Sequence, residues 1–232
     1  GIDTSLVKTN GKSLTRTNYQ LISKFGKKTT LNLKKLMLNT ETFLQNKTFI
    51  NELSRLITKD HEIAVKKIIQ LSGIIPDLIG FHGQTILHDP VNKTSIQIGD
   101  GKLLSKLTNI KVISNFREND LLNNGEGAPI APIYHKHLIE KYKFELPCCF
   151  VNIGGVANIT YWDGRNLLGY DLGPGNGLMD VYCQKNFNIS FDFSGKIASK
   201  GSANKDVVKK FKNSNYFKKR YPKSLDKLEF ID

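Results

Sequence analysis

The sequence predicts an α/β fold in which a mixed sheet is flanked by helices. Segments with strand-like and helix-like patterns alternate along the chain, and glycine-rich turns separate the strands. Apolar residues make up 39% of the 232 residues, which is enough for a real core. No stretch reaches the roughly 18 consecutive apolar residues that a membrane span needs, and the first residues lack the layout of a secretory signal. We therefore expect a globular, cytoplasmic protein that does not contact a membrane.

The first third of the chain is expected to hold strands followed by a long helix. Apolar and polar residues alternate loosely as far as Leu33, which indicates strands joined by a turn at Asn10 and Gly11. From Leu53 onward the apolar residues recur at helical spacing, and they stop at Gly73. This second pattern predicts a long amphipathic helix.

The alternation continues through the middle of the chain. Strand-like and helix-like segments are short here and are separated by glycine and aspartate, which favour turns and helix caps. The expected elements are a buried strand within residues 77–90 that leaves through Gly80 and Gly83 into a polar loop, a strand at 95–100, a helix capped by Asp100 through Leu107, and a strand at 111–116.

The second half is expected to contain a functional loop, a small set of strands and a helix. Residues 123–132 are too rich in glycine and proline to be regular. The expected elements are a helix at 133–141, strands within 149–173 folded at Gly154-Gly155 and at Asp163-Gly164, and a helix capped by Asn176 from Gly177 to about Lys185. Beyond residue 187 the composition becomes polar and basic, so we expect one domain at 1–185 and the start of a second domain at 186–232.

The chain is strongly basic, with a formal net charge of +13 at pH 7. Such a charge would suit nucleic-acid binding through phosphate contacts. However, the lysines are scattered, and no recognised nucleic-acid-binding pattern occurs, so a biased composition explains the charge better. The densest cluster, Lys205–Lys223, is typical of an exposed helical face. We therefore expect no nucleic-acid partner.

The three cysteines, Cys148, Cys149 and Cys183, offer neither a disulfide framework nor a Cys-x-x-Cys metal pair. We expect reduced and mostly buried thiols. His135 and His137 could be imagined as a metal pair, but no third ligand lies at a convincing spacing, so we expect no metal site built from protein side chains.

Two glycine turns, N-I-G-G-V-A-N and D-L-G-P-G-N-G, follow one another on strands that we expect to be neighbours. Glycine lets backbone N–H groups approach a ligand closely, and successive N–H groups in such turns can bind an anion such as phosphate. The expected helix after Asn176 would add the positive end of its dipole at the same edge. Ordinary tight hairpins would also explain either turn, and no P-loop or dinucleotide-binding pattern is present.

Asp171 stands where an apolar run breaks into the second glycine turn. A carboxylate at a strand end beside an anion site can take a proton from a hydroxyl or water. An aspartate that only caps a turn fits the residues equally well. Elsewhere, the glycines around His82 favour it as a substrate contact, and Arg117 and Asp120 could either pair with each other on the surface or face an acidic sugar substituent.

Six blocks stand out in order along the chain: GFHGQT at 80–85, IQIGD at 96–100, NFREND at 115–120, GEGAP at 125–129, NIGGVANIT at 152–160 and DLGPGNGLMD at 171–180. Together they closely resemble the anhydro-N-acetylmuramic acid kinase family, with matching blocks from about residue 1 to 224.

The resemblance implies the two-domain sugar kinase, Hsp70 and actin fold, which is ribonuclease H-like and holds ATP and sugar between its domains. Members of the family use ATP and water to open the 1,6-anhydro ring of anhydro-N-acetylmuramic acid and to phosphorylate O6. The product is N-acetylmuramic acid 6-phosphate, an intermediate of peptidoglycan recycling. The implied partners are therefore the amino sugar and ATP with Mg²⁺, whose charge phosphoryl transfer requires, and a homodimer fits the family.

The resemblance also implies a role for each matching residue. Asp171 would be the general base that activates the water attacking the anomeric carbon. The residues implied on the sugar side are His82, Gln84, Arg117, Asp120, Glu126 and Asn176. The residues implied on the phosphate side are Asn152, Gly154, Gly155, Asn158, Gly173 and Gly175.

Three features depart from the family pattern. The family opens with a loop of the form S-G-T-S-x-D-G-I-D that embraces ATP phosphates, whereas this chain starts at G-I-D. Glu126 stands where the family usually has Gln, and the segment from Tyr221 departs from the usual P-K-S-T-G-R-E. The family also runs well past residue 232. We therefore expect a chain that is cut at both ends, with an incomplete second domain.

Three hypotheses on function remain open at this level. The first is a kinase of this family, either one that lacks its ends or one piece of a split enzyme, so that the 232-residue chain by itself has little or no activity. The second is an inactive remnant of such a kinase that binds ATP poorly. The third is a basic nucleic-acid-binding protein, and only the net charge supports this hypothesis.

Overall fold

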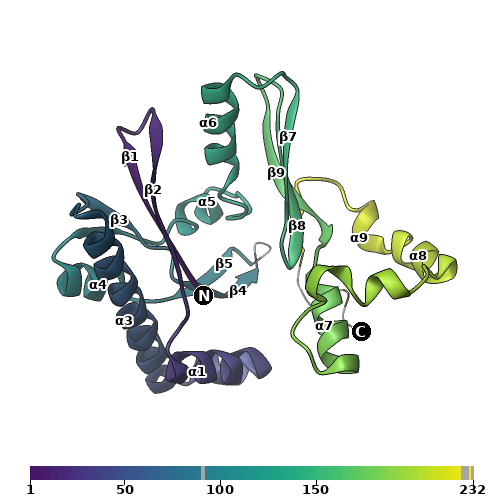
Figure 1. The fold of residues 1–232 in the computed structure, drawn as a ribbon, viewed down its shortest axis with the longest axis horizontal. Helices are drawn as coiled ribbons and strands as arrows, with labels where there is room; N and C mark the ends of the chain where they lie inside the picture. Colours follow the sequence, from purple (N-terminus) through teal and green to yellow (C-terminus); the bar gives the residue numbers. More distant parts are fainter. Residues whose placement is uncertain (90–91, 226–229, 231–232) are drawn as a thin grey trace. The chain divides into compact units, whose positions relative to one another are not determined.

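The computed structural model describes residues 1–89, 92–225 and 230. The chain divides into two compact units, Gly1–Gly127 and Ala128–Asp232 (Figure 1). The described residues form helices and small two- or three-stranded sheets, so the predicted α/β class is confirmed at this level. The predicted boundary after residue 185 falls inside the second unit, and a separate domain at 186–232 stays a prediction.

Unit 1 contains three two-stranded sheets, of which β1–β2 and β4–β5 are antiparallel and β3–β6 is parallel. Its elements are β1 (Ile2–Thr9), β2 (Leu14–Ser23), α1 (Lys27–Leu38), α2 (Thr40–Gln45), α3 (Lys47–Ser72), β3 (Leu78–Gly80), β4 (Gln84–Asp89), β5 (Thr94–Ile98), α4 (Gly101–Thr108), β6 (Lys111–Ile113) and α5 (Glu118–Leu122).

The core of unit 1 forms where α3 meets α1 and β5. Leu36 of α1, Leu53 and Ile57 of α3, and Ile98 of β5 pack together and are at most 3% exposed. All four are apolar, and α3 presents Leu53 and Ile57 one helical turn apart, so burial of its apolar face against α1 and β5 holds the unit together.

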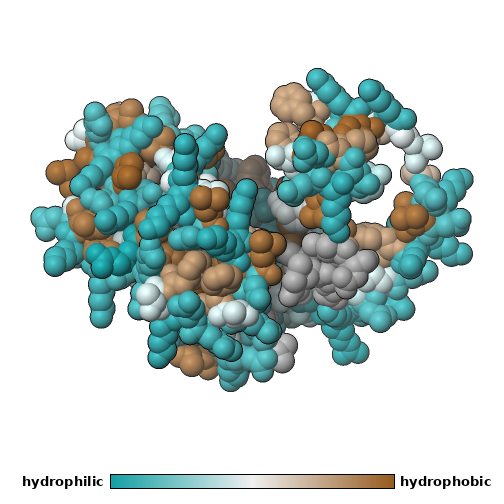
Figure 2. All heavy atoms as spheres, turned by 90° about the horizontal axis from the view of Figure 1, so that it is seen from below, coloured by the Kyte–Doolittle hydropathy of each residue, from teal (hydrophilic) through white to brown (hydrophobic). Residues whose placement is uncertain are grey.

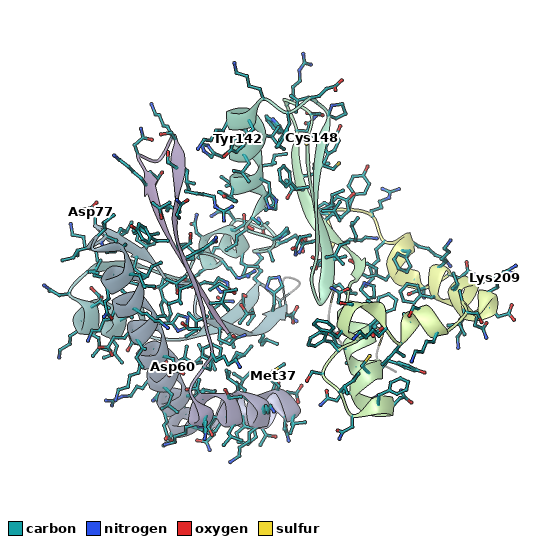
Figure 3. All side chains as sticks on the ribbon, in the orientation of Figure 1. Met37, Asp60, Asp77, Tyr142, Cys148 and Lys209 are labelled. Carbon is teal, nitrogen blue, oxygen red and sulfur yellow. The ribbon has the colours of Figure 1, made fainter. Side chains whose placement is uncertain are left out.

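The long helix α3 confirms the prediction from periodicity and begins earlier than expected. The side chain of Asn46 caps it by accepting a hydrogen bond from the N–H of Phe49, and Gly73 ends it in the left-handed conformation. Asp60 of α3 accepts a hydrogen bond of 3.0 Å from the N–H of Gly26, just before α1 (Figure 3). The cap explains why the helix starts before Leu53, where the apolar repeat becomes clear.

Two predictions for unit 1 were wrong in detail. Residues 27–33, predicted as strand, form the first turns of α1, because the loose alternation there includes Leu33 and Leu36 at helical spacing. Residues 84–89, predicted as a polar loop, form β4, which pairs with β5. Gly83, with a φ of 68°, makes the turn that separates β3 from β4.

Three other predictions for unit 1 were confirmed. The turn at Asn10 and Gly11 joins β1 to β2. The side chain of Asp100 caps α4 by accepting a hydrogen bond of 2.9 Å from the N–H of Leu103. Strands were predicted at 95–100 and 111–116 and lie there as β5 and β6.

Unit 2 is built on one antiparallel sheet in the order β7–β8–β9. Figure 1 shows α6 beside this sheet. Its elements are α6 (Pro132–Tyr142), β7 (Cys148–Ile153), β8 (Val156–Trp162), β9 (Leu167–Pro174), α7 (Gly177–Phe187), α8 (Lys205–Lys212) and α9 (Asn215–Lys218), with short 3₁₀ turns at Phe193–Gly195 and Ala198–Lys200.

The two predicted turns of this sheet are confirmed. At the β8–β9 turn, Asp163 accepts hydrogen bonds from the N–H groups of Asn166 and Arg165, at 2.6 and 2.8 Å. The bonds to Asn166, followed by that to Arg165, lower the pKa of Asp163 to about 2. Gly164 completes the turn with a φ of 95°. The turn between β7 and β8 is made by the pair Gly154-Gly155, as expected.

Helix α6 packs on one face of the sheet. His135 bonds the hydroxyl of Thr160 at 2.8 Å and stacks on Phe150, with ring centroids 4.9 Å apart. Gly169, opposite Thr160 in the register, leaves room for the ring of Pro132. His135 therefore packs α6 against the sheet. Among the described residues, it belongs to no group of three or more His, Cys, Asp or Glu side chains that could hold a metal ion.

The surface is mostly polar. Figure 2 shows hydrophilic side chains over most of the visible face, with smaller hydrophobic patches between them. The basic cluster is helical only in part, in α8 and α9, and Lys209 of α8 is labelled in Figure 3. The expectation of mostly buried thiols was wrong, because only Cys183 is buried. Cys148 is half-buried, and Cys149 is exposed because side chains alternate along β7. Within the described residues, no helix has the length and apolar character needed to cross a bilayer.

Candidate functional site

Three of the predicted polar residues form one row across the sheet of unit 2. Asn152 of β7 pairs with Asn158 of β8, and Asn158 pairs with Asp171 of β9. Directly opposite residues of an antiparallel sheet project to the same face, so the three side chains share a face. The register skips a residue just after Asp171, which is a β-bulge of the kind often found beside active sites. The sheet thus brings together residues that lie about twenty positions apart.

The two glycine turns lie side by side next to this row. The N–H groups of Gly175 and Gly177 donate to the carbonyl oxygen of Gly155, at 3.1 and 3.2 Å, and the N–H of Asn176 donates to that of Gly154 at 2.7 Å. These three hydrogen bonds fasten the second turn onto the first. The N–H of Gly175 is therefore occupied, and a role for Gly175 in phosphate binding stays a prediction.

The reasons for glycine differ between the two turns. A Cβ at Gly175 would overlap the carbonyl oxygen of Gly154, and one at Gly177 would lie 2.8 Å from that of Gly155. By contrast, a Cβ at Gly155 would meet nothing within 4 Å, and Gly155 does not need a left-handed backbone. Packing therefore explains why residues 175 and 177 are glycine. At Gly155, by contrast, the missing side chain leaves space in which a ligand could approach the backbone.

Helix α7 begins at this edge, although its cap differs from the one predicted. The side chain of Asn176 makes no cap hydrogen bond, and its amide group instead donates to the carbonyl of Ile153 at 3.3 Å. Among the described residues, the next two N–H groups of the helix, those of Leu178 and Met179, have no hydrogen-bond partner. Two N–H donors at a helix start can bind an anion, since the dipole adds a positive end there.

Asp171 is half-buried and is held by a segment that lies far away in the sequence. Its carboxylate oxygen Oδ2 accepts a hydrogen bond of 2.9 Å from the N–H of Leu225, and its own N–H donates to the carbonyl of Lys223 at 2.9 Å. The hydroxyl of Tyr216 donates to the carbonyl of Asp171 at 2.8 Å. These three contacts were not predicted, because nothing in the local sequence links residues 216–225 to a strand 45 positions earlier.

Gly173 has a different neighbour. A Cβ at this position would come within 3.0 Å of the ring of Phe217, which belongs to α9. The packing of α9 on β9 therefore accounts for this glycine, and a role for Gly173 in phosphate binding stays a prediction.

In unit 1, His82 and Arg117 are bonded to each other. The Nε and Nη2 of Arg117 lie 3.1 and 3.0 Å from the Nε2 of His82 and can only donate to it, while the Nδ1 of His82 bonds the carbonyl of Gly83 at 3.1 Å. The ring therefore carries its proton on Nδ1. Burial lowers the pKa of His82, and the charge of Arg117 lowers it further, against the opposing bond to Gly83. His82 is thus neutral near pH 7.

Arg117 and Asp120 are not an ion pair; instead, both bind the same loop. Arg117 Nη1 donates to the carbonyl of Gly127 at 2.9 Å, and the N–H of Gly127 donates to Asp120 Oδ2 at 2.7 Å. The short helix α5, which was not predicted, presents both side chains to this loop. Glu126 is half-buried in the loop, whose glycine-rich character was predicted.

A cavity of about 310 Å³ opens in unit 1 beside His82. Its volume lies at the lower end of the range for small-molecule sites. The polar residues that line it and were not predicted are Ser95, Gln97, Ser114 and Asn115. Gln97 and Asn115 stand within the blocks IQIGD and NFREND, so those blocks carried a signal for them. Gln84 begins β4, and its side-chain amide donates to the carbonyl of Thr85 at 3.2 Å.

The predicted site residues therefore fall into two groups. The first, which lies in unit 1, comprises His82, Gln84, Arg117, Asp120 and Glu126. The second, which lies in unit 2, comprises Asn152, Gly154, Gly155, Asn158, Asp171, Gly173, Gly175 and Asn176. In the part of the chain that the structure describes, no cluster of three or more His, Cys, Asp or Glu side chains could hold a metal ion.

Unit 2 has paired glycine turns beside a carboxylate, and unit 1 has a polar cavity. These features suit a class of protein that binds two ligands, a phosphorylated molecule and a polar small molecule. Comparison with known proteins narrows this class. The family described as "Anhydro-N-acetylmuramic acid kinase" matches residues 1–231. The chain belongs to this family.

Three curated relatives carry the same name. The relative from Pelagibacter ubique (strain HTCC1062) is 40% identical over 218 residues, covering 90% of this chain and 57% of its own length. The one from Bradyrhizobium diazoefficiens is 35% identical over 241 residues, covering 99% and 65%. The one from Agrobacterium fabrum (strain C58 / ATCC 33970) is 40% identical over 189 residues, covering 78% and 50%. The chain thus spans between half and two thirds of the length of these relatives.

Proposed function

We propose that the chain is part of an ATP-dependent kinase. This kinase opens the ring of 1,6-anhydro-N-acetylmuramic acid with water and phosphorylates the O6 atom. It acts in the cytoplasm, in peptidoglycan recycling. Family membership and the names of the relatives support the reaction. The observation that carries the assignment to residues is the row across the sheet of unit 2, in which Asp171 lies beside the interlocked glycine turns. The finer fold proposed is that of sugar kinases, Hsp70 and actin.

In this proposal Asp171 is the general base. Its carboxylate takes one proton from a water molecule as the water oxygen bonds the anomeric carbon of the sugar, and the bond from that carbon to O6 breaks. The released O6 then attacks the γ-phosphorus, and ADP leaves. The half-buried position of Asp171 beside the interlocked glycine turns supports this role.

The phosphate side is assigned to the turn at Gly154-Gly155 and the start of α7. The open approach to Gly155 and the N–H groups of Leu178 and Met179 would bind phosphate oxygens, and Asn152 and Asn158 would donate side-chain hydrogen bonds. Mg²⁺ would arrive with ATP as part of the substrate, where it neutralises phosphate charge.

The sugar side is assigned to the cavity beside His82 and to the loop held by Arg117 and Asp120. A neutral His82 with its proton on Nδ1 fixes the guanidinium of Arg117, which would face the lactyl carboxylate that distinguishes a muramic acid from other amino sugars. Gln84, Glu126 and Asn176 stay predicted substrate contacts.

The test is an ATP-dependent assay on anhydro-N-acetylmuramic acid with Mg²⁺. It is run on the 232-residue chain and on the same chain extended by the part of the Pelagibacter ubique relative that it does not span. The extended chain is expected to form N-acetylmuramic acid 6-phosphate and ADP, and the shorter chain to form much less. Absence of product from a folded extended chain would favour the inactive remnant, and salt-sensitive retention on DNA would favour nucleic-acid binding.

A further inference from the structure

The segment that follows α8 encloses Asp171 from the side opposite to β8. Among the residues that the structure describes, β9 pairs with β8 alone, so it is an edge strand of the three-stranded sheet. Edge strands present backbone groups that need other partners. At Asp171 these partners are supplied by Tyr216, Lys223 and Leu225, which we call the clamp.

We propose that the clamp positions the carboxylate of Asp171 for proton abstraction, with the backbone N–H of Leu225 as the group that orients it. This inference rests on the proposed role of Asp171 as the base. The N–H of Leu225 reaches the carboxylate itself at 2.9 Å, whereas the other two contacts reach the backbone of Asp171. The clamp therefore fixes both the strand and the side chain of the same residue.

Tyr216 holds the clamp together. Its side chain is fully buried, and its hydroxyl donates to the carbonyl of Asp171 at 2.8 Å. Its own carbonyl accepts a hydrogen bond of 3.1 Å from the Nζ of Lys223, which also lies 4.5 Å from the centre of the Tyr216 ring. Lys223 in turn accepts the N–H of Asp171, so Tyr216, Lys223 and Asp171 form a closed set of contacts. Such a set restricts the position of each member more than a single bond does.

The clamp also explains how the departure from the family pattern at residue 225 can be tolerated. The contact from Leu225 to Asp171 is made by the backbone, so the identity of the side chain at 225 does not decide it. What the contact requires is an N–H at this position and a chain path that brings it to the carboxylate. Proline is the residue that would remove the donor, because it has no N–H.

A first experiment needs no turnover and uses the 232-residue chain. The amide signals of Asp171 and Leu225 are assigned by NMR in wild type, Asp171→Asn and Tyr216→Phe. An N–H that donates to a carboxylate resonates downfield and is protected from hydrogen exchange. We expect the Leu225 signal to move upfield in Asp171→Asn and both amides to lose protection in Tyr216→Phe. An unmoved Leu225 signal in Asp171→Asn would overturn the proposal.

A second experiment measures turnover in the extended chain. Leu225→Pro and Leu225→Ala form a matched pair, because only the proline variant lacks the N–H. Tyr216→Phe is matched by Tyr221→Phe, which removes an exposed hydroxyl from the same segment. We expect kcat to fall about tenfold or more in Leu225→Pro and Tyr216→Phe, with KM for the sugar within about twofold, and both controls to stay near wild type.

The outcomes separate the two proposals. If Asp171→Asn keeps its turnover, the role of Asp171 as base fails, and the clamp has nothing to position. If Asp171→Asn is inactive while Tyr216→Phe and a folded Leu225→Pro keep wild-type kcat, the positioning role fails and the base remains. A rise in kcat for Leu225→Pro would also overturn positioning, because it would make the clamp a restraint. If Leu225→Pro does not fold, the kcat of Tyr216→Phe and the NMR comparison test the positioning role instead.

Discussion

The interlocked glycine turns of unit 2 yield a prediction that separates stability from nucleotide binding. It compares Gly175→Ala with Gly155→Ala. At Gly175 the new Cβ would lie inside 3.0 Å of the Gly154 carbonyl oxygen and 3.2 Å from the N–H nitrogen of Ala157. Both are backbone atoms, so the two turns must move apart. At Gly155 the new Cβ would meet nothing within 4 Å.

The size of the effect follows from the hydrogen bonds at stake. Separating the turns would weaken the three bonds that Gly175, Asn176 and Gly177 donate to Gly154 and Gly155. At about 1 kcal/mol for each bond, the loss is about 3 kcal/mol, which is also the upper end for overpacking. For a chain of this size that loss lowers Tm by about 6–12 °C.

Thermal unfolding followed by circular dichroism measures the first effect, and calorimetric titration with Mg·ATP measures the second. We expect Gly155→Ala to keep the wild-type Tm and to weaken Mg·ATP binding about tenfold, equivalent to about 1.4 kcal/mol, because the methyl group stands where phosphate oxygens approach. The reasoning is refuted if Gly175→Ala unfolds at the wild-type Tm. It is refuted equally if Gly155→Ala is as unstable as Gly175→Ala, or binds Mg·ATP as wild type does.

Three further predictions concern unit 1. Folding lowers the pKa of His82 below its ordinary value of 6.5, so the unfolded chain binds a proton at this ring first as the pH falls. The stability that depends on a neutral His82 is therefore present above pH 6.5 and is lost as the pH falls further. Between about pH 7.5 and about pH 5.5, the free energy of unfolding in urea should fall less in His82→Gln than in wild type. Asp120→Ala removes the acceptor of the Gly127 N–H and should cost about 1–3 kcal/mol in urea unfolding, whereas an unchanged midpoint would mean that the bond is dispensable. Leu53→Ala should cost about 2–5 kcal/mol because Leu53 is fully buried in α3, whereas Leu71→Ala, on the exposed face of the same helix, should change stability by less than about 0.5 kcal/mol, and equal effects would contradict the described core.

The elements that could be predicted from the sequence are those whose signal is local. Helix α3 follows from the spacing of Leu53, Ile57 and their successors, and the strands β7–β9 follow from the turn residues at Gly154-Gly155 and Asp163-Gly164. Among the elements that were wrong or missed, β4 and α5 are short. Their residues take their conformation from pairing with β5 and from the contacts of Arg117 with the loop at Gly127.

The candidate site was predictable in its composition and less so in its connections. Asp171 and the glycine turns could be found because glycine and aspartate at the end of an apolar run are unusual. Their arrangement in one row with Asn152 and Asn158 depends on the register of three strands, which the sequence leaves open. The clamp could not be predicted, because a backbone N–H leaves no trace in residue identity.

The most direct test of the central claim is the turnover of Asp171→Asn against wild type in the extended chain, with Mg·ATP affinity measured on both proteins. If the carboxylate takes the proton from water, the variant should keep its affinity for Mg·ATP and lose at least about 100-fold in kcat. Turnover near the wild-type rate in the variant would contradict the account, and another group would have to remove that proton.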